Sequence, residues 1–170
     1  MKKMIVYAMV AMMAFSICAC GSKGDANKRG DQNTSVAEDS QQIPNPWQDC
    51  DSITDAQKNV GFDMNVPDKV GDYTQAWIQT MDKEMIQVDY TSGKDELMIR
   101  KAASNDDPSG DYNAYNKEET VNVGDLSVTM KGNDDRMNLA VWNDGEYSYS
   151  VYASAGMSQE MLAEIVSQVQ

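Results

Sequence analysis

From about residue 45 onward, apolar and polar residues alternate along most of the chain. Alternation with a period of two sends successive side chains to opposite faces of a strand, so each alternating stretch predicts a half-buried β-strand. Short sequences rich in Gly, Asn and Asp separate the stretches, as expected for tight turns, and Asp144-Gly145 is the clearest two-residue hairpin signal. The predicted strands cover residues 62–66, 73–81, 85–91, 97–102, 121–123, 126–130, 137–141 and 147–151.

Two segments have the pattern of helices. Ser52 followed by Asp55 resembles a capping box, which predicts a short helix to about Asn59 with Gly61 near its C-terminal cap. Ser158 can cap a second helix, and Glu160 in its first turn suits the helix dipole. The apolar stripe of this second helix consists of Met161, Leu162, Ile165, Val166 and Val169. The predicted fold is α+β: an antiparallel meander of about six to eight strands, with a short N-terminal helix and a C-terminal helix packed on the sheet.

The N-terminus has a different character. Lys2 and Lys3 precede a nearly continuous apolar run that is shorter than the roughly 20 residues a membrane-spanning helix needs. The run ends in Ile17-Cys18-Ala19-Cys20-Gly21, which resembles the bacterial lipobox: an aliphatic residue, two small residues and a cysteine. The resemblance implies that residues 1–19 are a lipoprotein signal peptide and that Cys20 carries a diacylglyceryl anchor. Two acyl chains would hold the protein on the outer, extracytoplasmic face of the cell membrane.

A polar segment follows the lipobox. It contains no aromatic residue and almost no aliphatic one up to residue 44, so it cannot bury enough apolar surface to offset its ordering entropy. We therefore expect residues 20–44 to be a lipidated flexible tether and residues 45–170 to be a single domain.

The composition of the chain limits the partners and the kinds of site that it can have. The net charge of −13 becomes −15 when Lys2 and Lys3 leave with the signal peptide, which argues against nucleic acid as a partner. The chain has no histidine, so triads and metal sites that depend on imidazole are excluded. With Cys18 in the leader and Cys20 acylated, Cys50 is the remaining thiol; it could join another chain, but we expect a small buried residue beside Trp47. We expect no cofactor.

Acidic residues leave two alternatives open. Glycoside hydrolysis needs only two carboxyl groups, so a carboxylate-dependent hydrolase of the cell wall remains an alternative, although no pair stands out among the 27 acids. Acidic clusters at 105–111 and 133–135 contain oxygen ligands suited to calcium, but they lack the EF-hand pattern and also suit turns. The polar stretch 104–119 is long for a loop without regular structure, and such loops are uncommon and sometimes functional.

The final hairpin supplies the candidate interaction surface. Counting alternation along it groups Trp142, Ser148, Ser150 and Tyr152 on one side and Tyr147, Tyr149 and Val151 on the other. One side can pack under the helix, and the other would then be exposed. We therefore expect Trp142 and Tyr152 to contact a partner, with cross-strand packing as the competing interpretation.

Several short sequences resemble one family of secreted bacterial domains, catalogued as domain of unknown function 4367. They are Asn45-Pro46-Trp47, Gly61-Phe62, Val66-Pro67, the run 129–134, and the run 142–151 followed by Ser158 and a short helix. More distantly, the architecture resembles lipoprotein-carrier-like curved sheets. The family resemblance implies an exported or membrane-tethered context and brings no catalytic residues.

Together these features predict a membrane-anchored extracytoplasmic bacterial lipoprotein that is not an enzyme. It would act as a binding, sensing or interaction module, with an envelope protein, a peptide or a glycan as partner. A carrier of a hydrophobic ligand in the sheet's concavity is the third alternative. A flat aromatic surface would favour interaction, a groove with paired carboxyl groups would favour hydrolysis, and a deep apolar cavity would favour the carrier.

Overall fold

A computed structural model describes residues 45–170 of the protein. These residues belong to one compact unit. The predicted signal peptide, Cys20 and the predicted tether lie outside the described residues, so those interpretations remain predictions.

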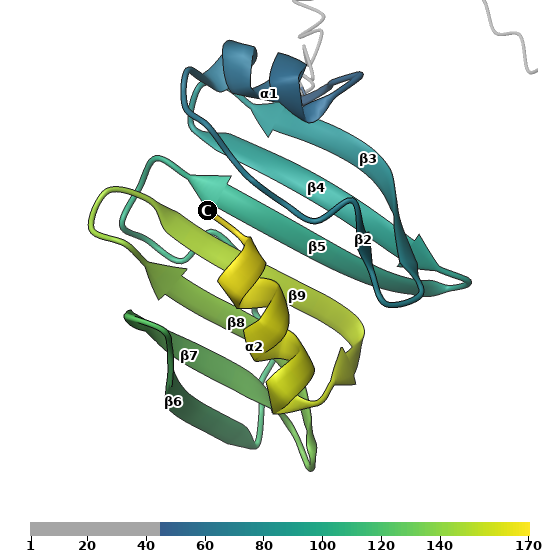
Figure 1. Cartoon of the computed structure of the whole chain (residues 1–170), viewed down its shortest axis with the longest axis vertical. Helices are drawn as coiled ribbons and strands as arrows, with labels where there is room; N and C mark the ends of the chain where they lie inside the picture. Colours follow the sequence, from purple (N-terminus) through teal and green to yellow (C-terminus); the bar gives the residue numbers. More distant parts are fainter. Residues whose placement is uncertain (1–44) are drawn as a thin grey trace, which may run out of the picture. The chain divides into compact units, whose positions relative to one another are not determined.

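The described residues form one antiparallel sheet of nine strands, somewhat more than the six to eight expected, because two strands of two or three residues add to its edge. Hydrogen-bonded neighbours follow the order β1-β3-β4-β5-β9-β8-β7-β6, and β2 also pairs with β3. Two runs of sequential hairpins are therefore joined where β9 pairs with β5 (Figure 1). The strands are β1 (Trp47–Asp49), β2 (Lys69–Val70), β3 (Tyr73–Met81), β4 (Met85–Ser92), β5 (Asp95–Ala102), β6 (Lys117–Val123), β7 (Leu126–Asn133), β8 (Arg136–Asn143) and β9 (Ser148–Met157).

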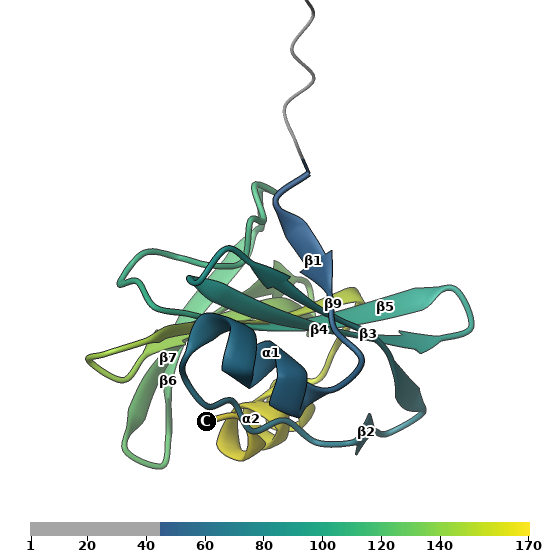
Figure 2. The ribbon, with the colours of Figure 1, turned by 90° about the horizontal axis from the view of Figure 1, so that it is seen from above.

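Both helices lie on the same side of the sheet (Figure 2). In α1 (Ile53–Val60), the Ser52 hydroxyl accepts a hydrogen bond from the Asp55 amide, and Gly61 ends the helix with φ of 89°. In α2 (Gln159–Gln168), the Ser158 hydroxyl accepts from the Met161 amide. Local capping chemistry therefore places both helices as the sequence predicts.

The core lies between the helices and the sheet. Leu162, Ile165 and Val166 of α2 are buried against strand residues such as Ile99 and Val151. Val169 follows the helix and is also buried. Met161, predicted to belong to the apolar stripe, is 47% exposed and lies at the edge of the packed surface.

The segment 62–66 is not a strand, contrary to the prediction. It runs as an irregular connection from α1 to β2, and Met64 is buried beneath it. Its backbone pairs with the C-terminus instead of a strand: the Asn65 amide donates to the Gln170 carbonyl at 2.8 Å, and the Gln170 amide donates back at 3.3 Å. Phe62 and Val66 also pack against the core, so the alternating pattern here reflects a loop lying over the core.

Candidate functional site

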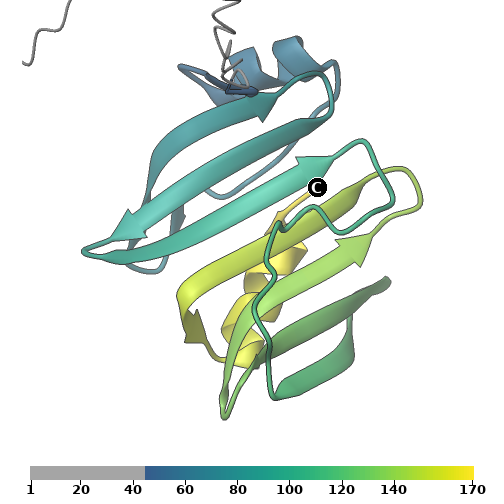
Figure 3. The ribbon, with the colours of Figure 1, turned by 180° about the vertical axis from the view of Figure 1, so that it is seen from behind.

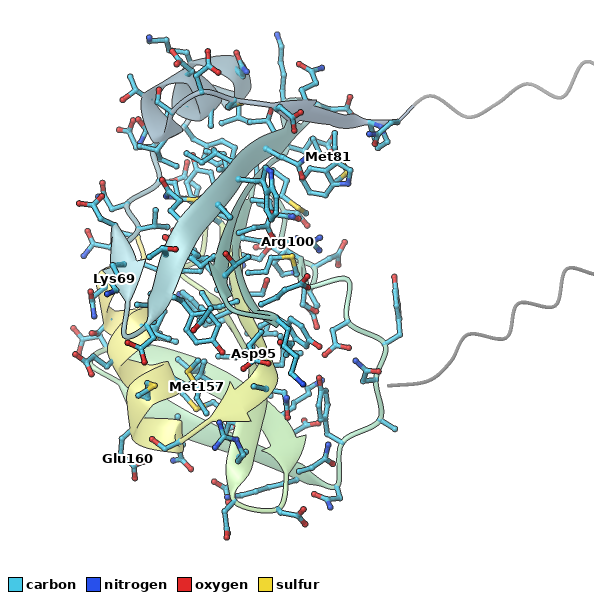
Figure 4. All side chains as sticks on the ribbon, turned by 90° about the vertical axis from the view of Figure 1, so that its right-hand side faces the viewer. Lys69, Met81, Asp95, Arg100, Met157 and Glu160 are labelled. Carbon is cyan, nitrogen blue, oxygen red and sulfur yellow. The ribbon has the colours of Figure 1, made fainter. Side chains whose placement is uncertain are left out.

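The sheet has one face without a helix, which we call the open face. In Figure 4, the labelled Arg100 and Met81 project to this side, whereas Lys69 and Glu160 lie on the helix side. Strand register assigns further residues to the open face, because paired residues share a face: Trp77 is opposite Asp89, and Met98 is opposite Tyr152. Whatever the domain binds through the uncovered side of its sheet must contact this surface.

The long connection between β5 and β6, residues 103–116, crosses the open face (Figure 3). Arg100 fixes it there, because its Nη1 donates to the Pro108 carbonyl at 2.9 Å and to the Ser109 carbonyl at 2.7 Å. Gly110 follows with φ of 63°, and a Cβ at this position would lie 2.9 Å from Arg100 Nη1. Glycine therefore satisfies both the backbone conformation and the close approach of the guanidinium group.

Arg100 also organises the sheet beneath the loop. Its Nε donates to Gln87 Oε1 at 2.8 Å, and Gln87 Nε2 donates to Asp89 Oδ2 at 2.7 Å. Its guanidinium carbon lies 5.3 Å from the centre of the Trp47 ring. Burial raises the pKa of Asp89, against the opposing effects of Gln87 and Arg100, and burial lowers the pKa of Arg100. The network makes this part of the open face a rigid, polar floor.

Two of the three acids of the crossing loop, Asp107 and Asp111, accept hydrogen bonds within the loop. Asp107 Oδ1 accepts from the Ser109 amide, and Asp111 accepts from the Asn113 amide and from the Tyr115 hydroxyl. Within residues 45–170, no group of three or more His, Cys, Asp or Glu side chains is arranged to hold a metal ion. The cluster at 105–111 thus has a local role in shaping turns, as its composition also suggested.

Trp142 is not exposed, so its predicted position is wrong. It is 4% exposed on the helix side of the sheet and stacks on Tyr149, with ring centres 5.1 Å apart and planes 4° from parallel. The turn between β8 and β9 has four residues, and Trp142 consequently pairs with Tyr149. Across a turn with an even number of residues, even-numbered positions of one strand pair with odd-numbered positions of the next, and paired residues share a face. The sequence interpretation instead kept all even-numbered positions of both strands on one face.

Tyr152 does lie on the open face, where it is half-buried. Together with Met98 and the loop residues Ser109, Gly110 and Asp111 it lines a shallow cleft of about 230 Å³. The structure therefore separates the two predicted surface aromatics: Tyr152 is accessible to a partner, and Trp142 belongs to the core.

Trp77 is a surface aromatic of the sheet that the sequence interpretation missed. It is 60% exposed on the open face. A signal was present, because Trp77 and Ile78 are adjacent in one strand and must point to opposite faces. Ile78 is buried, which leaves Trp77 outside.

The helix side holds an unexpected buried cation. Lys101 is 6% exposed, and its Nζ donates to the Asp63 carbonyl at 2.7 Å. The same atom lies 4.4 Å from the centre of the Tyr147 ring and 5.2 Å from that of Tyr149. Lys101 thus ties the 62–66 segment to the final hairpin, which is a structural role.

Cys50 is half-buried and packs against the hydrophobic core. Its Sγ lies 3.8 Å from Thr80 Oγ1, a buried residue of the helix side. Trp47, three residues earlier, contacts Arg100 on the open face. The expectation of a buried Cys50 beside Trp47 is therefore met only in part: Cys50 packs against the core but is half-buried, and Trp47 lies on the open face instead.

The described clefts are small. The cleft between β2 and α2 measures about 290 Å³, and the one beside Trp142 and Tyr149 about 280 Å³. Pockets for small molecules usually measure about 300–1,000 Å³, so both clefts lie at the lower end of that range. Neither helix of the described residues is long and apolar enough to cross a membrane.

Comparison with known proteins adds one finding. A family model described as Domain of unknown function (DUF4367) matches residues 63–169, which include every strand from β2 to β9 and helix α2. No curated protein and no solved structure matches the chain. The family match agrees with the resemblance predicted from the sequence, and the chain belongs to the family described as Domain of unknown function (DUF4367).

Proposed function

We propose that this protein is a membrane-anchored extracytoplasmic bacterial lipoprotein whose open face binds a partner without catalysis. The anchor is Cys20, inferred from the lipobox. The net charge of the chain, −13, would keep the domain clear of anionic headgroups and free to meet a partner.

The observation that carries the proposal is the exposure of Trp77 on a face that no helix covers. A single exposed apolar residue needs no explanation by itself. Here, however, the tryptophan stands beside a floor fixed by Arg100, Gln87 and Asp89, and a half-buried Tyr152 lies further along the same face. A rigid surface carrying aromatic side chains loses little conformational entropy on binding, which favours affinity.

Photocrosslinking in living cells tests the proposal. Benzoylphenylalanine replaces Trp77 or Tyr152 on the open face, and Met161 on the exposed side of α2 serves as the matched control. We expect a specific crosslinked product from positions 77 and 152 but none from position 161. Equal products from all three positions, or none from 77 and 152, would contradict the use of the open face.

The hydrolase alternative has its own test. Asp89 is the open-face acid with a raised pKa, so it would be the acid group of such an enzyme. Release of soluble sugars from purified cell-wall polymer, abolished in Asp89→Asn, would replace the binding proposal with a catalytic one.

A further inference from the structure

A notch at the edge of the sheet carries features that single out a class of partner. β1 pairs with residues 79–81 of β3, and β2 pairs with residues 73 and 74. Between them, Gln75, Ala76 and Trp77 have no strand on their outer side. A shallow cleft of about 170 Å³ lies at this gap, and we call it the Trp77 notch. Its lining includes Asp49, Asp51, Gln75, Ala76 and Trp77.

The notch combines negative charge with an aromatic ring. Asp49 and Asp51 are both exposed, and Asp49 Oδ1 accepts a hydrogen bond from the side-chain Nε2 of Gln79 at 2.8 Å. Neither carboxylate takes part in an ion pair with a described residue. The described ion pairs are Lys58–Asp55, Lys117–Glu119 and Lys131–Glu118. The notch therefore presents two carboxylates, neither of them in an ion pair with a residue of 45–170, beside an exposed indole ring.

These features match a cationic side chain. An ammonium or guanidinium group is attracted to the face of an indole ring and to carboxylates at the same time. The volume is too small for a typical small-molecule ligand. The bulge between Gln75 and Trp77, in the pairing of β3 with β4, makes β3 irregular next to the notch, and β1 and β2 flank the gap, so main-chain addition of a full strand is not the expected mode.

We propose that the Trp77 notch binds a lysine or arginine side chain of an extended peptide segment in the partner protein. This inference rests on the proposed function and names the partner's chemistry: a protein with a basic segment, not a glycan or a lipid surface. Asp49 and Asp51 neutralise the cation, and Trp77 covers its alkyl stem and charge. The excess of acidic residues in the chain accelerates the encounter with a basic peptide, and the notch determines where the cationic side chain binds.

The test uses a chain that starts at Gly21 and retains the whole compact unit. The probe is the peptide acetyl-Gly-Thr-Arg-Thr-Lys-Thr-Gly-amide, and its control has glutamine in place of both basic residues. Backbone amide shifts are followed by NMR during titration at fixed ionic strength. We expect saturable shifts at residues 49–51 and 75–78 and at the Trp77 indole N–H, with none from the glutamine peptide.

Two matched pairs of variants separate the notch from general attraction. Asp49→Asn with Asp51→Asn should raise Kd about ten-fold, because the local ion pairs are lost. Asp125→Asn with Asp135→Asn removes the same charge at exposed turns of the other half of the sheet and should change Kd less than about two-fold. Trp77→Ala should raise Kd about five-fold, whereas Tyr112→Ala, at a residue 97% exposed on the loop, should not.

Each possible result supports or overturns the proposal. Shifts spread over the acidic surface, equal effects of the two charge pairs, or no binding would overturn the basic-peptide assignment. If crosslinks from positions 77 and 152 persist in that case, the open face still binds a partner and only this inference fails. If the crosslinks are also absent, the proposed function fails with it.

Discussion

The ammonium group of Lys101 lies 4.4 Å from the centre of the Tyr147 ring, in a position where the lysine is almost completely buried. Burial lowers the pKa of Lys101, and nearby Asp144, Asp63 and Glu146 oppose that shift. The Asp63 carbonyl is the acceptor of its hydrogen bond. The charge is thus stabilised by a carbonyl, three aromatic rings and carboxylates that form no direct ion pair with it.

Replacing Lys101 separates its charge from its packing. Lys101→Met keeps most of the volume and removes the desolvated charge, so the free energy of unfolding should change by less than about 1 kcal/mol. Lys101→Ala leaves a cavity beneath the aromatic rings and should cost about 2–4 kcal/mol. Urea titration at pH 7 compares the two. An equal cost for both variants would mean that the charge itself stabilises the fold.

Ionisation of Tyr90 should lower the free energy of unfolding at alkaline pH. Burial raises its pKa to about 12, and its hydroxyl donates to the Pro67 carbonyl at 2.7 Å. The unfolded tyrosine ionises near pH 10, so the folded state binds more protons above that pH. The stabilisation is complete below about pH 10 and is lost as the pH rises towards 12, by up to about 3 kcal/mol.

Tyr90→Phe tests this limit, because phenylalanine cannot ionise. Near pH 8 the variant should be about 1 kcal/mol less stable than wild type, owing to the lost hydrogen bond. The difference should shrink and then reverse as the pH rises to about 11.5. Lys101 remains in both proteins, so its opposite pH dependence cancels in the comparison. Parallel stability curves for wild type and variant would contradict the assignment.

Helix α2 should contribute stability through one side only. Leu162 and Ile165 are 0% and 2% exposed, so Leu162→Ala and Ile165→Ala should each lower the free energy of unfolding by about 2–5 kcal/mol. Met161→Ala, at a position 47% exposed, should cost less than about 1 kcal/mol. Denaturant titration of the three variants provides the comparison. Similar losses at all three positions would show that the helix packs differently in solution.

The lipid anchor is tested at Cys20. Cys20→Ala should abolish incorporation of labelled fatty acid and leave the protein unprocessed or released from the membrane fraction. Cys50→Ala is the matched control and should be labelled as wild type. Continued labelling and normal fractionation of Cys20→Ala would place the anchor elsewhere.

The fold was largely predictable because its signals are local. The caps act through residues next to them: Ser52 and Ser158 begin the two helices, and Gly61 ends the first, as expected. The strands of the meander follow one another with short turns, so alternation and turn residues were sufficient to find most of them. The segment 62–66 failed because a loop over a core can alternate as a strand does, and only its pairing with Gln170 distinguishes the two.

The site was less predictable because it depends on which face each strand turns to the helices. For Trp142 this was set by the length of the turn after β8, and for Trp77 by the burial of its neighbour Ile78. The network of Arg100 with Gln87 and the loop carbonyls joins residues 8 to 13 positions apart in the sequence. No single stretch of sequence contains that arrangement.

The pairing of β5 with β9 has a consequence for assembly. Each half of the sheet is built from sequential hairpins, whereas this seam joins Leu97 to Ala153 and closes a loop of more than fifty residues. If the seam opened, both halves would keep their internal pairing and would expose β5 and β9 as free edges. Two molecules could then exchange halves about the 103–116 connection and form a domain-swapped dimer. Arg100 fastens that connection to β5 through the Pro108 and Ser109 carbonyls, so the contacts that hold the crossing loop on the open face also favour closure of the sheet within one chain.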